Sequence, residues 1–302
     1  MTEKITNDVI ARKLFLPDPE ECYRIIRQTR WPEGVICPHC GSKEVQKNGH
    51  TPKGAQKYHC KNCGKYFNDL TGTIFDHHKL PINEVFYIIW SMPHKSTKLI
   101  AEELNRNYQA VLNFVHKVQK TAGNSKVRLE DVIEIDEVYP HAGSKGFKKE
   151  SQTERQAQTW QGTAKFGKPP VVTLVVRNTG RVLFLLFENL REFPQKFKQR
   201  VGNLIVGGLK VFTDEYSIYD SLKKGLGSII ISHERINHSG KEFARGEVHV
   251  NTCENRHSFL RTYLRKYRGV SFRWLQGYLD FLALVLNNRG WFSELISARI
   301  HI

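Results

Sequence analysis

The segment DVIEIDEV, residues 131–138, constrains the fold more than any other, because it places four carboxylates in a run of Val and Ile. Such β-branched residues favour a buried or half-buried strand. A buried charge is costly unless it is paired or coordinates a metal, so the segment predicts a functional site at the exposed end of a core strand. The alternative is an edge strand whose acids lie in solvent.

A second segment has the same design. In KVFTDEY an apolar run ends in Asp214, as the run before Asp136 does. If both strands lie centrally in one sheet, the two carboxylates can meet and hold hard divalent cations through oxygen. Two magnesium ions held in this way would polarise a phosphodiester, activate the attacking oxygen and stabilise the leaving one. A third acid would complete such a site.

Glu254, at the start of a predicted helix, is the candidate third acid. An acid in a first helical turn also suits the positive end of the helix dipole, so a capping role is the alternative. The following residues favour the functional role, because 255–273 contain six Arg or Lys residues and no acid. A helix of this kind suits DNA held beside catalytic ions. The candidate DNA contacts on it are Arg256, Arg261, Arg265, Lys266 and Arg268.

Three further acids lie near these candidates. Glu137 and Glu215 directly follow Asp136 and Asp214. Because successive side chains of a strand point to opposite faces, we expect only one of each pair to reach the site. Glu134 shares the face of Asp136, and we expect it to have a structural or supporting role.

The net charge indicates the class of partner. The chain has 46 Lys and Arg against 30 Asp and Glu, a formal charge of +16. Such an excess supplies most of non-specific nucleic-acid affinity, although a basic ribosome-associated or membrane-surface protein would share it. No window approaches the roughly 20 apolar residues that span a bilayer, and the N-terminus lacks the apolar run of a secretory signal. We expect a cytoplasmic protein that is nucleoid-associated when bound to DNA.

Four of the six cysteines form two closely spaced pairs, Cys37 with Cys40 and Cys60 with Cys63. In an intracellular chain, two such knuckles predict one tetrahedral zinc site rather than disulfides. The module around them is too small for a large core, so we expect it to depend on its metal to fold. The remaining cysteines are expected to be small apolar residues: Cys22 and Cys253.

The order of predicted elements divides the chain into four regions: an N-terminal helical segment (1–34), a zinc ribbon (35–72), a helical region (73–126) and a catalytic domain (127–302). In the last region, three early strands, two of them joined by an Asn-Thr-Gly turn, precede alternating helices and strands, and two helices close the chain. This order is typical of an α/β ribonuclease-H-like fold with a mixed five-stranded sheet.

The helical region fits a helix-turn-helix. Ser96 or Thr97 can cap a first helix, and residues 105–107 can turn into a second. This second helix, roughly Gln109 to Lys120, could enter a major groove. Paired amphipathic helices are more often simply packed together, so the pattern alone does not decide between these interpretations.

The chain resembles the DDE transposases of bacterial and archaeal insertion sequences in the segments EIDEVY, VFTDEY, HVNTCENRHSFLRTYLRKYRGVS and YLDFLALVLNNR. More narrowly it resembles their ISXO2-like group, which carries an N-terminal zinc ribbon like CPHCGS and HCKNCGKYF here. The resemblance covers about residues 20–295, and the combination of motifs in this order is its specific part. It implies metal ligation by Asp136, Asp214 and Glu254. Because relatives vary at the third ligand, Asn251 and His249 stay open as alternatives.

The same resemblance implies an activity. It implies a transposase that binds the ends of its element, cleaves phosphodiester bonds with Mg²⁺ or Mn²⁺, and joins the freed 3′ hydroxyls to target DNA. Zn²⁺ would hold the ribbon, and Arg261 would contact end DNA. Bringing two ends together implies a homodimer or a higher oligomer. Two alternatives remain: a domesticated, non-catalytic DNA-binding regulator, which would not need the acids, and a stand-alone metal-dependent nuclease, which would cleave without joining.

Overall fold

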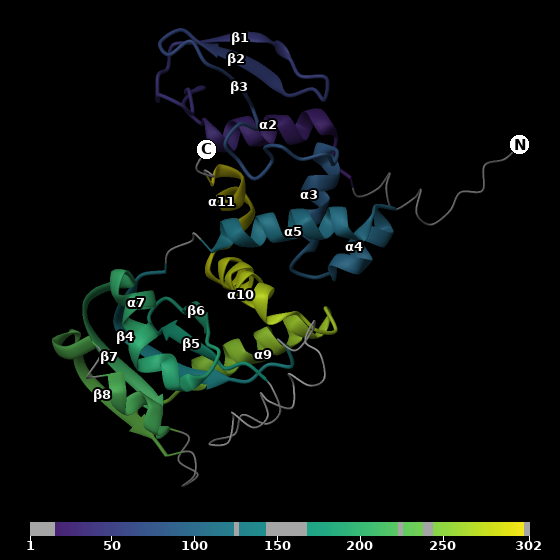
Figure 1. Ribbon diagram of the computed structural model, residues 1–302. Coiled ribbons are helices and arrows are strands. Elements are labelled where there is room, and N and C mark those ends of the chain that lie inside the picture. Colours follow the sequence, from purple (N-terminus) through teal and green to yellow (C-terminus); the bar gives the residue numbers. More distant parts are fainter. Residues whose placement is uncertain (1–15, 124–126, 143–167, 223–225, 238–243, 299–302) are drawn as a thin grey trace, which may run out of the picture. The chain divides into compact units, whose positions relative to one another are not determined.

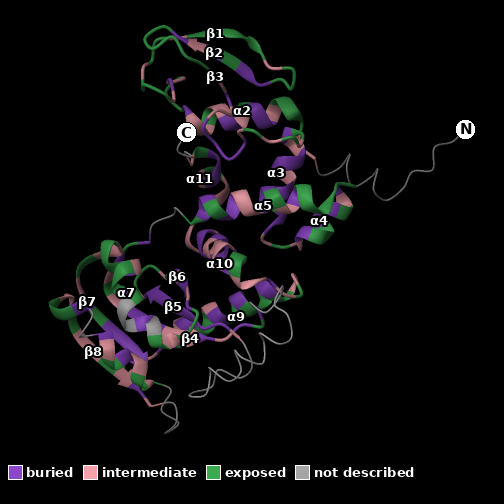
Figure 2. Cartoon of the chain, in the orientation of Figure 1, coloured by how far each residue is buried: buried purple, intermediate pink, exposed green. Residues whose placement is uncertain are grey.

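The computed structural model describes residues 16–123, 127–142, 168–222, 226–237 and 244–298 (Figure 1). Its contacts divide the chain into two units, residues 1–122 with 290–302 and residues 123–289. Each unit has its own secondary structure and its own set of buried residues (Figure 2).

The first unit begins with helix α2 (Pro19–Arg30). Asp18 caps this helix, because its side chain accepts hydrogen bonds from two backbone N–H groups of the first turn. Cys22 is fully buried in α2, and burial raises the pKa of its thiol to about 12. The prediction that Cys22 is a small apolar residue is therefore confirmed.

The ribbon is an antiparallel three-stranded sheet in the order β1 (Val45–His50), β2 (Gln56–Cys60) and β3 (Tyr66–Asn68). Its small core is aromatic. The rings of Tyr58 and Phe67 stack with centroids 5.1 Å apart, and Trp31 meets Tyr58 edge-on at 5.8 Å. The third strand, β3, is the shortest of the sheet.

Asp69 fastens the ribbon to α2. Its buried carboxylate accepts hydrogen bonds from the backbone N–H of Gln56 at 2.7 Å and from the hydroxyl of Tyr58 at 3.1 Å. From α2, Arg27 Nε lies 3.3 Å from Asp69 Oδ2, and Arg30 donates to the Asp69 carbonyl. Burial nevertheless raises the pKa of Asp69, because these partners do not fully replace water.

Three helices follow the ribbon: α3 (Ile82–Ser91), α4 (Thr97–Glu103) and α5 (Tyr108–Ala122). Ser96 caps α4, because its hydroxyl accepts a hydrogen bond from the backbone N–H of Leu99 at 3.2 Å. Asn107 caps α5 in the same way, through the backbone N–H of Gln109 at 2.8 Å. The predicted pair of helices is thus confirmed, with residues 105–110 exposed at the turn and the first turn of α5.

The end of the chain differs from the prediction. Residues 290–302 belong to the first unit, and a third late helix, α11 (Trp291–Ser297), lies among them. Aromatic contacts explain this placement. Phe292 meets Phe86 edge-on with centroids 5.4 Å apart, and Trp291 stacks on Trp90 at 6.2 Å. The region predicted as one catalytic domain, 127–302, therefore does not include α11.

The second unit contains a five-stranded sheet in the order β6-β5-β4-β7-β8. Its strands are β4 (Leu129–Val138), β5 (Val171–Val176), β6 (Arg181–Leu186), β7 (Ile205–Asp214) and β8 (Ile230–Ile236). β5 and β6 form an antiparallel hairpin beside β4, whereas β7 runs parallel to β4, and β8 to β7. This mixed sheet with flanking helices confirms the predicted ribonuclease-H-like core.

Among the described residues, the flanking helices are α7 (Phe193–Val201), α9 (Asn251–Arg265) and α10 (Phe272–Asn287). Short 3₁₀ segments lie between the elements: η1 (Leu190–Glu192), η2 (Gly202–Leu204), η3 (Ser217–Ser221) and η4 (Gly227–Ile229). The helix predicted after β7 begins as the 3₁₀ turn η3 and becomes α-helical at Leu222, the last described residue before 223–225. On one face of β4, Ile133 and Ile135 join the core beneath α7. On the other face, which carries Glu134 and Asp136, α9 packs against β4 and β5 (Figure 1).

Helix α10 covers the β6 edge of the sheet with side-chain amides. Asn287 accepts a hydrogen bond from the backbone N–H of Val182 at 2.7 Å and donates to its carbonyl at 2.8 Å. Gln276 accepts from the N–H of Leu186 at 2.8 Å and donates to the carbonyl of Phe184 at 2.9 Å. An open edge could pair with another chain, so α10 takes the place of a sixth strand.

Candidate metal sites and nucleic-acid interface

The register of two parallel strands brings the predicted acids together. Glu134 of β4 pairs with Phe212 of β7, so Asp136 and Asp214, two residues further along each strand, lie side by side on one face. Ligand oxygens of Asp136, Glu137 and Asp214 all lie within 4.8 Å of one another. Three carboxylates thus meet where β4 and β7 end.

The presence of Glu137 in this group corrects the prediction that its side chain cannot reach the site. It does start on the opposite face of β4, where the hydroxyl of Tyr219 donates to its Oε2 at 2.7 Å. Near the end of a strand, however, a long side chain can extend beyond the backbone, and its own N–H donates to Asp136 Oδ1 at 2.9 Å. For the second pair the prediction agrees with the structure, since Glu215 is exposed and lies outside the group.

The clustered carboxyl groups have raised pKa values. Burial, followed by the charges of Glu137 and Asp214, raises the pKa of Asp136 to about 8. Burial also raises the pKa of Glu137 to about 7. Carboxylates so close together disfavour one another's ionisation, and a cation between them removes that repulsion. The donor set consists of carboxylate oxygens, which fits a hard divalent ion.

Glu254 lies at the edge of the group. It is exposed in the first turn of α9, and its charge contributes to the raised pKa of Asp136. Its oxygens are outside the set of atoms within 4.8 Å. Of the two alternative ligands, His249 is engaged elsewhere, with Nδ1 3.0 Å from Arg177 Nη2. Asn251 is exposed at the first position of α9.

His257, for which the sequence patterns predict no role, faces Asp136 from α9. His257 is 3% exposed, its Nδ1 lies 3.7 Å from Asp136 Oδ2, and its Nε2 lies 2.9 Å from the hydroxyl of Thr173. Burial, aided by the charge of Arg261, lowers its pKa to about 3, so the ring is neutral near pH 7. The sequence does contain a signal for this role, because His257 lies one turn after Glu254 on the same predicted helix.

The four cysteines of the ribbon form the second metal-ligand group, with all Sγ atoms within 4.8 Å of one another. The Sγ atoms of Cys37 and Cys63 are 3.7 Å apart, and those of Cys40 and Cys60 are 3.6 Å apart. A tetrahedron with Zn–S bonds of about 2.3 Å has edges of about 3.8 Å, so these cysteines fit zinc. A hydrogen bond with the backbone of Ser42 lowers the pKa of Cys40 to about 6, whereas the pKa of Cys63 rises to about 11 despite a backbone hydrogen bond with Lys65, because its thiol is hydrogen-bonded to the other sulfurs. Zinc binding would release the protons that these thiols share.

Comparison with known proteins identifies the family. Residues 128–284, more than half of the chain, match the ISXO2-like transposase domain. The chain belongs to the ISXO2-like transposase family. Residues 17–66 of this transposase match the transposase zinc-ribbon domain. A relative from Halobacterium salinarum, described as an uncharacterized protein in transposable element ISH50, is 30% identical over 259 residues, or 84% of this chain and 86% of the relative. The resemblance read from the motifs is confirmed.

The five predicted DNA contacts of the transposase differ in their surroundings. Arg261, Arg265 and Arg268 are exposed. Arg256 instead donates to the carbonyl of Gly180 in the β5–β6 turn at 2.8 Å. Lys266 lies over the rings of two tyrosines, 4.2 and 4.9 Å from their centroids, and burial lowers its pKa to about 7. Exposed arginines are the better phosphate ligands, so these three remain the stronger candidates for DNA contact, two in α9 and Arg268 just after it.

Further predictions concern the segment between β4 and β5, membrane-spanning helices and Cys253. Residues 141–168, between β4 and β5, are rich in Lys and Arg, a composition that fits either a DNA-facing or a solvated loop, and 143–167 lie outside the described residues. Among the helices that the structure describes, none combines the length and apolar character needed to cross a bilayer. Cys253 is fully buried in α9, with its Sγ 3.7 Å from the Thr173 carbonyl, as expected for a small apolar residue.

Proposed function

We propose that this ISXO2-like transposase binds the ends of its insertion sequence, cleaves phosphodiester bonds there and joins the freed 3′ hydroxyls to target DNA. The observation that carries the proposal is the group formed by Asp136, Glu137 and Asp214 at the ends of two adjacent parallel strands. In a chain of this family, oxygen donors so placed support a site for Mg²⁺ or Mn²⁺.

In this proposal Asp136, Asp214 and Glu254 hold the divalent ions, and Glu137 is a further donor within reach. When bound, the ions polarise the phosphodiester, activate the attacking water or hydroxyl and stabilise the leaving oxygen. The protein fixes the ligand positions beforehand. Tyr219 orients Glu137 through a 2.7 Å hydrogen bond, so fewer side chains need to be ordered when the site forms.

The remaining parts of the chain supply nucleic-acid affinity. The exposed arginines of α9, in the same helix as Glu254, are placed to hold phosphates near the cleaved bond. The zinc ribbon and the exposed first turn of α5 recognise the element ends in this proposal. Synapsis of two ends requires at least a homodimer, because each protomer brings one carboxylate group.

The test is cleavage and strand transfer on duplexes from both flanks of the gene, with Mg²⁺ or Mn²⁺. We expect the wild type to cut and join, and Asp136→Asn, Asp214→Asn and Glu254→Gln to do neither while still binding the ends. Glu215→Gln is the matched control, since Glu215 is exposed beside Asp214 and outside the group. It should retain both activities.

Other results would replace the proposal. Binding without cutting by the wild type would favour a DNA-binding regulator, and cutting without joining would favour a nuclease. Loss of activity in the Asp variants but not in Glu254→Gln would move the third ligand to another residue, with Glu137 the first to examine. Comparison with Glu137→Gln would then decide between the two glutamates.

A further inference from the structure

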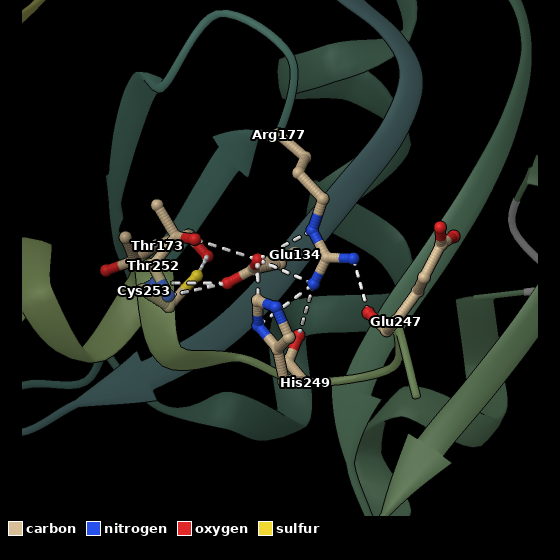
Figure 3. A network of polar contacts seen from close by, with 7 residues as sticks. All are labelled: Glu134, Thr173, Arg177, Glu247, His249, Thr252 and Cys253. Atoms are coloured by element: carbon tan, nitrogen blue, oxygen red, sulfur yellow. Dashed lines mark hydrogen bonds and ion pairs between the residues drawn. The ribbon is translucent and has the colours of Figure 1, made fainter. Parts of the chain in front are cut away.

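Helix α9 is capped from the sheet rather than from its own sequence. Its N-cap residue, Val250, is buried and provides no capping side chain. Glu134 of β4 takes this role. Its Oε2 accepts hydrogen bonds from the backbone N–H of Thr252 at 2.9 Å and of Cys253 at 3.2 Å, and its Oε1 accepts from the Thr252 hydroxyl at 2.9 Å (Figure 3). The carboxylate thus meets the positive end of the helix dipole.

Arg177 balances the charge of this fully buried carboxylate. Its Nη2 and Nε lie 2.9 and 3.0 Å from Glu134 Oε1. The same guanidinium donates to the carbonyl of His249 at 3.1 Å and to the carbonyl of Glu247, both just before α9 (Figure 3). Glu134 of β4 therefore holds the first turn of α9 directly, and its partner Arg177 holds the segment that leads into α9.

The location of this anchor matters because metal-ligand candidates adjoin it on both elements. Glu134 lies two residues before Asp136 on the same face of β4, and Cys253, which it binds, immediately precedes Glu254. We infer that Glu134 is a positioning residue, which holds the first turn of α9 so that Glu254 and His257 face Asp136. This inference rests on the proposed function of the carboxylate group.

A simpler role for Glu134 is to neutralise Arg177 and so to stabilise the fold. The two roles make different demands on the side chain. Neutralisation requires only a negative charge near the guanidinium. Positioning requires two acceptor oxygens, one for the N–H groups of Thr252 and Cys253 and one for the Thr252 hydroxyl and Arg177. An amide offers only one oxygen, so its NH₂ group opposes the donors at the other position.

The first test is Glu134→Gln in the full-length protein. We expect the rate of DNA cleavage to fall about 10- to 100-fold with end-DNA affinity unchanged. Mn²⁺ affinity, measured by titration calorimetry without DNA, should weaken. Amide hydrogen exchange should accelerate at Thr252 and Cys253 but not at Leu260, further along α9. Glu130→Gln, a half-buried acid of the same strand outside this network, is the control and should change none of these.

The double variant Glu134→Gln with Arg177→Met separates the two roles, because it removes both buried charges. If Glu134 positions α9, the double variant keeps the weak Mn²⁺ affinity and the fast exchange of the single variant. Recovery of wild-type Mn²⁺ affinity and exchange in the double variant would overturn the inference in favour of charge neutralisation.

Thr252→Val is a second test, which keeps the inference testable if the Glu134 variants misfold. It is nearly isosteric and removes only the hydroxyl bond to Glu134. We expect the same pattern of changes at a smaller size, and unchanged Mn²⁺ affinity and exchange would contradict the inference. If wild-type protein neither cuts nor joins DNA, the proposed function fails, whereas Mn²⁺ titration and amide exchange still test the positioning role.

Discussion

The zinc ribbon and the carboxylate group both gather ligands for cations, but they relate to the fold in opposite ways. The ribbon brings four thiols together around a core of a few aromatic side chains. The carboxylate group sits on a sheet that has a large core of its own. We expect metal to complete the fold of the ribbon, whereas in the second unit the fold is complete and holds acids that repel one another. Stability and metal binding should therefore be separable in the second unit and inseparable in the ribbon.

The strongest test of this contrast is removal of zinc. We expect a chelator, or Cys40→Ser, to unfold the ribbon, because structural zinc contributes about 10–16 kcal/mol to small zinc modules. The five-stranded sheet should stay folded. Amide exchange resolved by residue would show loss of protection in β2 and retention in β5. Protection of β2 that survives zinc removal would show instead that the aromatic core suffices.

At the carboxylate group, loss of a ligand should have the reverse effect. We expect Asp214→Asn to lower the rate of DNA cleavage at least a thousandfold, about 4 kcal/mol of activation free energy. Without divalent ions the same variant should be as stable as the wild type or more so, because one repelling charge is gone. Thermal unfolding with and without Mg²⁺ measures this. A clear loss of stability in the metal-free variant would mean that Asp214 is structural.

The same contrast explains what the sequence could predict. The grouping of the four cysteines is predictable because each pair is separated by two residues, so local spacing alone describes it. The grouping of Asp136 with Asp214 is predictable because each ends an apolar strand, and the order of elements predicts that the strands share a sheet. Both predictions depend on patterns that extend over a few residues. The strands, α9 and α10 followed from the same kind of pattern.

Features that depend on packing between distant segments were missed. Glu137 reaches the carboxylate group because Tyr219 and the end of β4 allow it, and strand alternation pointed the other way. The capping of α9 by Glu134 joins residues far apart in sequence, so no local capping motif predicts it. Likewise α11 joins the first unit through Phe86 and Trp90, which its own sequence does not reveal.

The pH dependence of stability should differ in sign between the zinc ribbon and the second unit. Asp136 has a folded pKa of about 8 against an ordinary value of 3.8, so between these values the folded state binds a proton that the unfolded chain lacks. Stability of the metal-free second unit therefore falls as pH rises through this window, by up to about 1.4 kcal/mol per pH unit for one proton. Acidification of the ribbon instead protonates thiolates and releases zinc.

The cleanest range for this measurement is pH 6.5 to 8. Below 6.5, His257 acts in the opposite direction, because its folded pKa of about 3 lies under its ordinary value of 6.5. Urea unfolding of wild type and Asp136→Asn across this range measures the Asp136 contribution together with its coupling to Glu137, whose pKa of about 7 lies in the same range. We expect the variant to show a flatter profile, and saturating Mg²⁺ to flatten the wild-type profile too. Equal slopes in both metal-free proteins would contradict the raised pKa.

The smallest effect concerns the cations of α9, where charge that binds phosphate must be told from charge that builds the fold. Each phosphate contact changes the slope of log affinity against log salt by about 0.9. We expect Arg261→Ala to reduce the slope by roughly this amount, because its side chain is exposed. Arg256→Ala should leave the slope unchanged but lower stability, since Arg256 ties α9 to the carbonyl of Gly180. Binding isotherms at several salt concentrations measure the slope, and thermal unfolding measures stability. If Arg256→Ala alone reduced the slope, its guanidinium would have to leave Gly180 on binding DNA, and the fold of α9 would be coupled to its partner as closely as the ribbon is coupled to zinc.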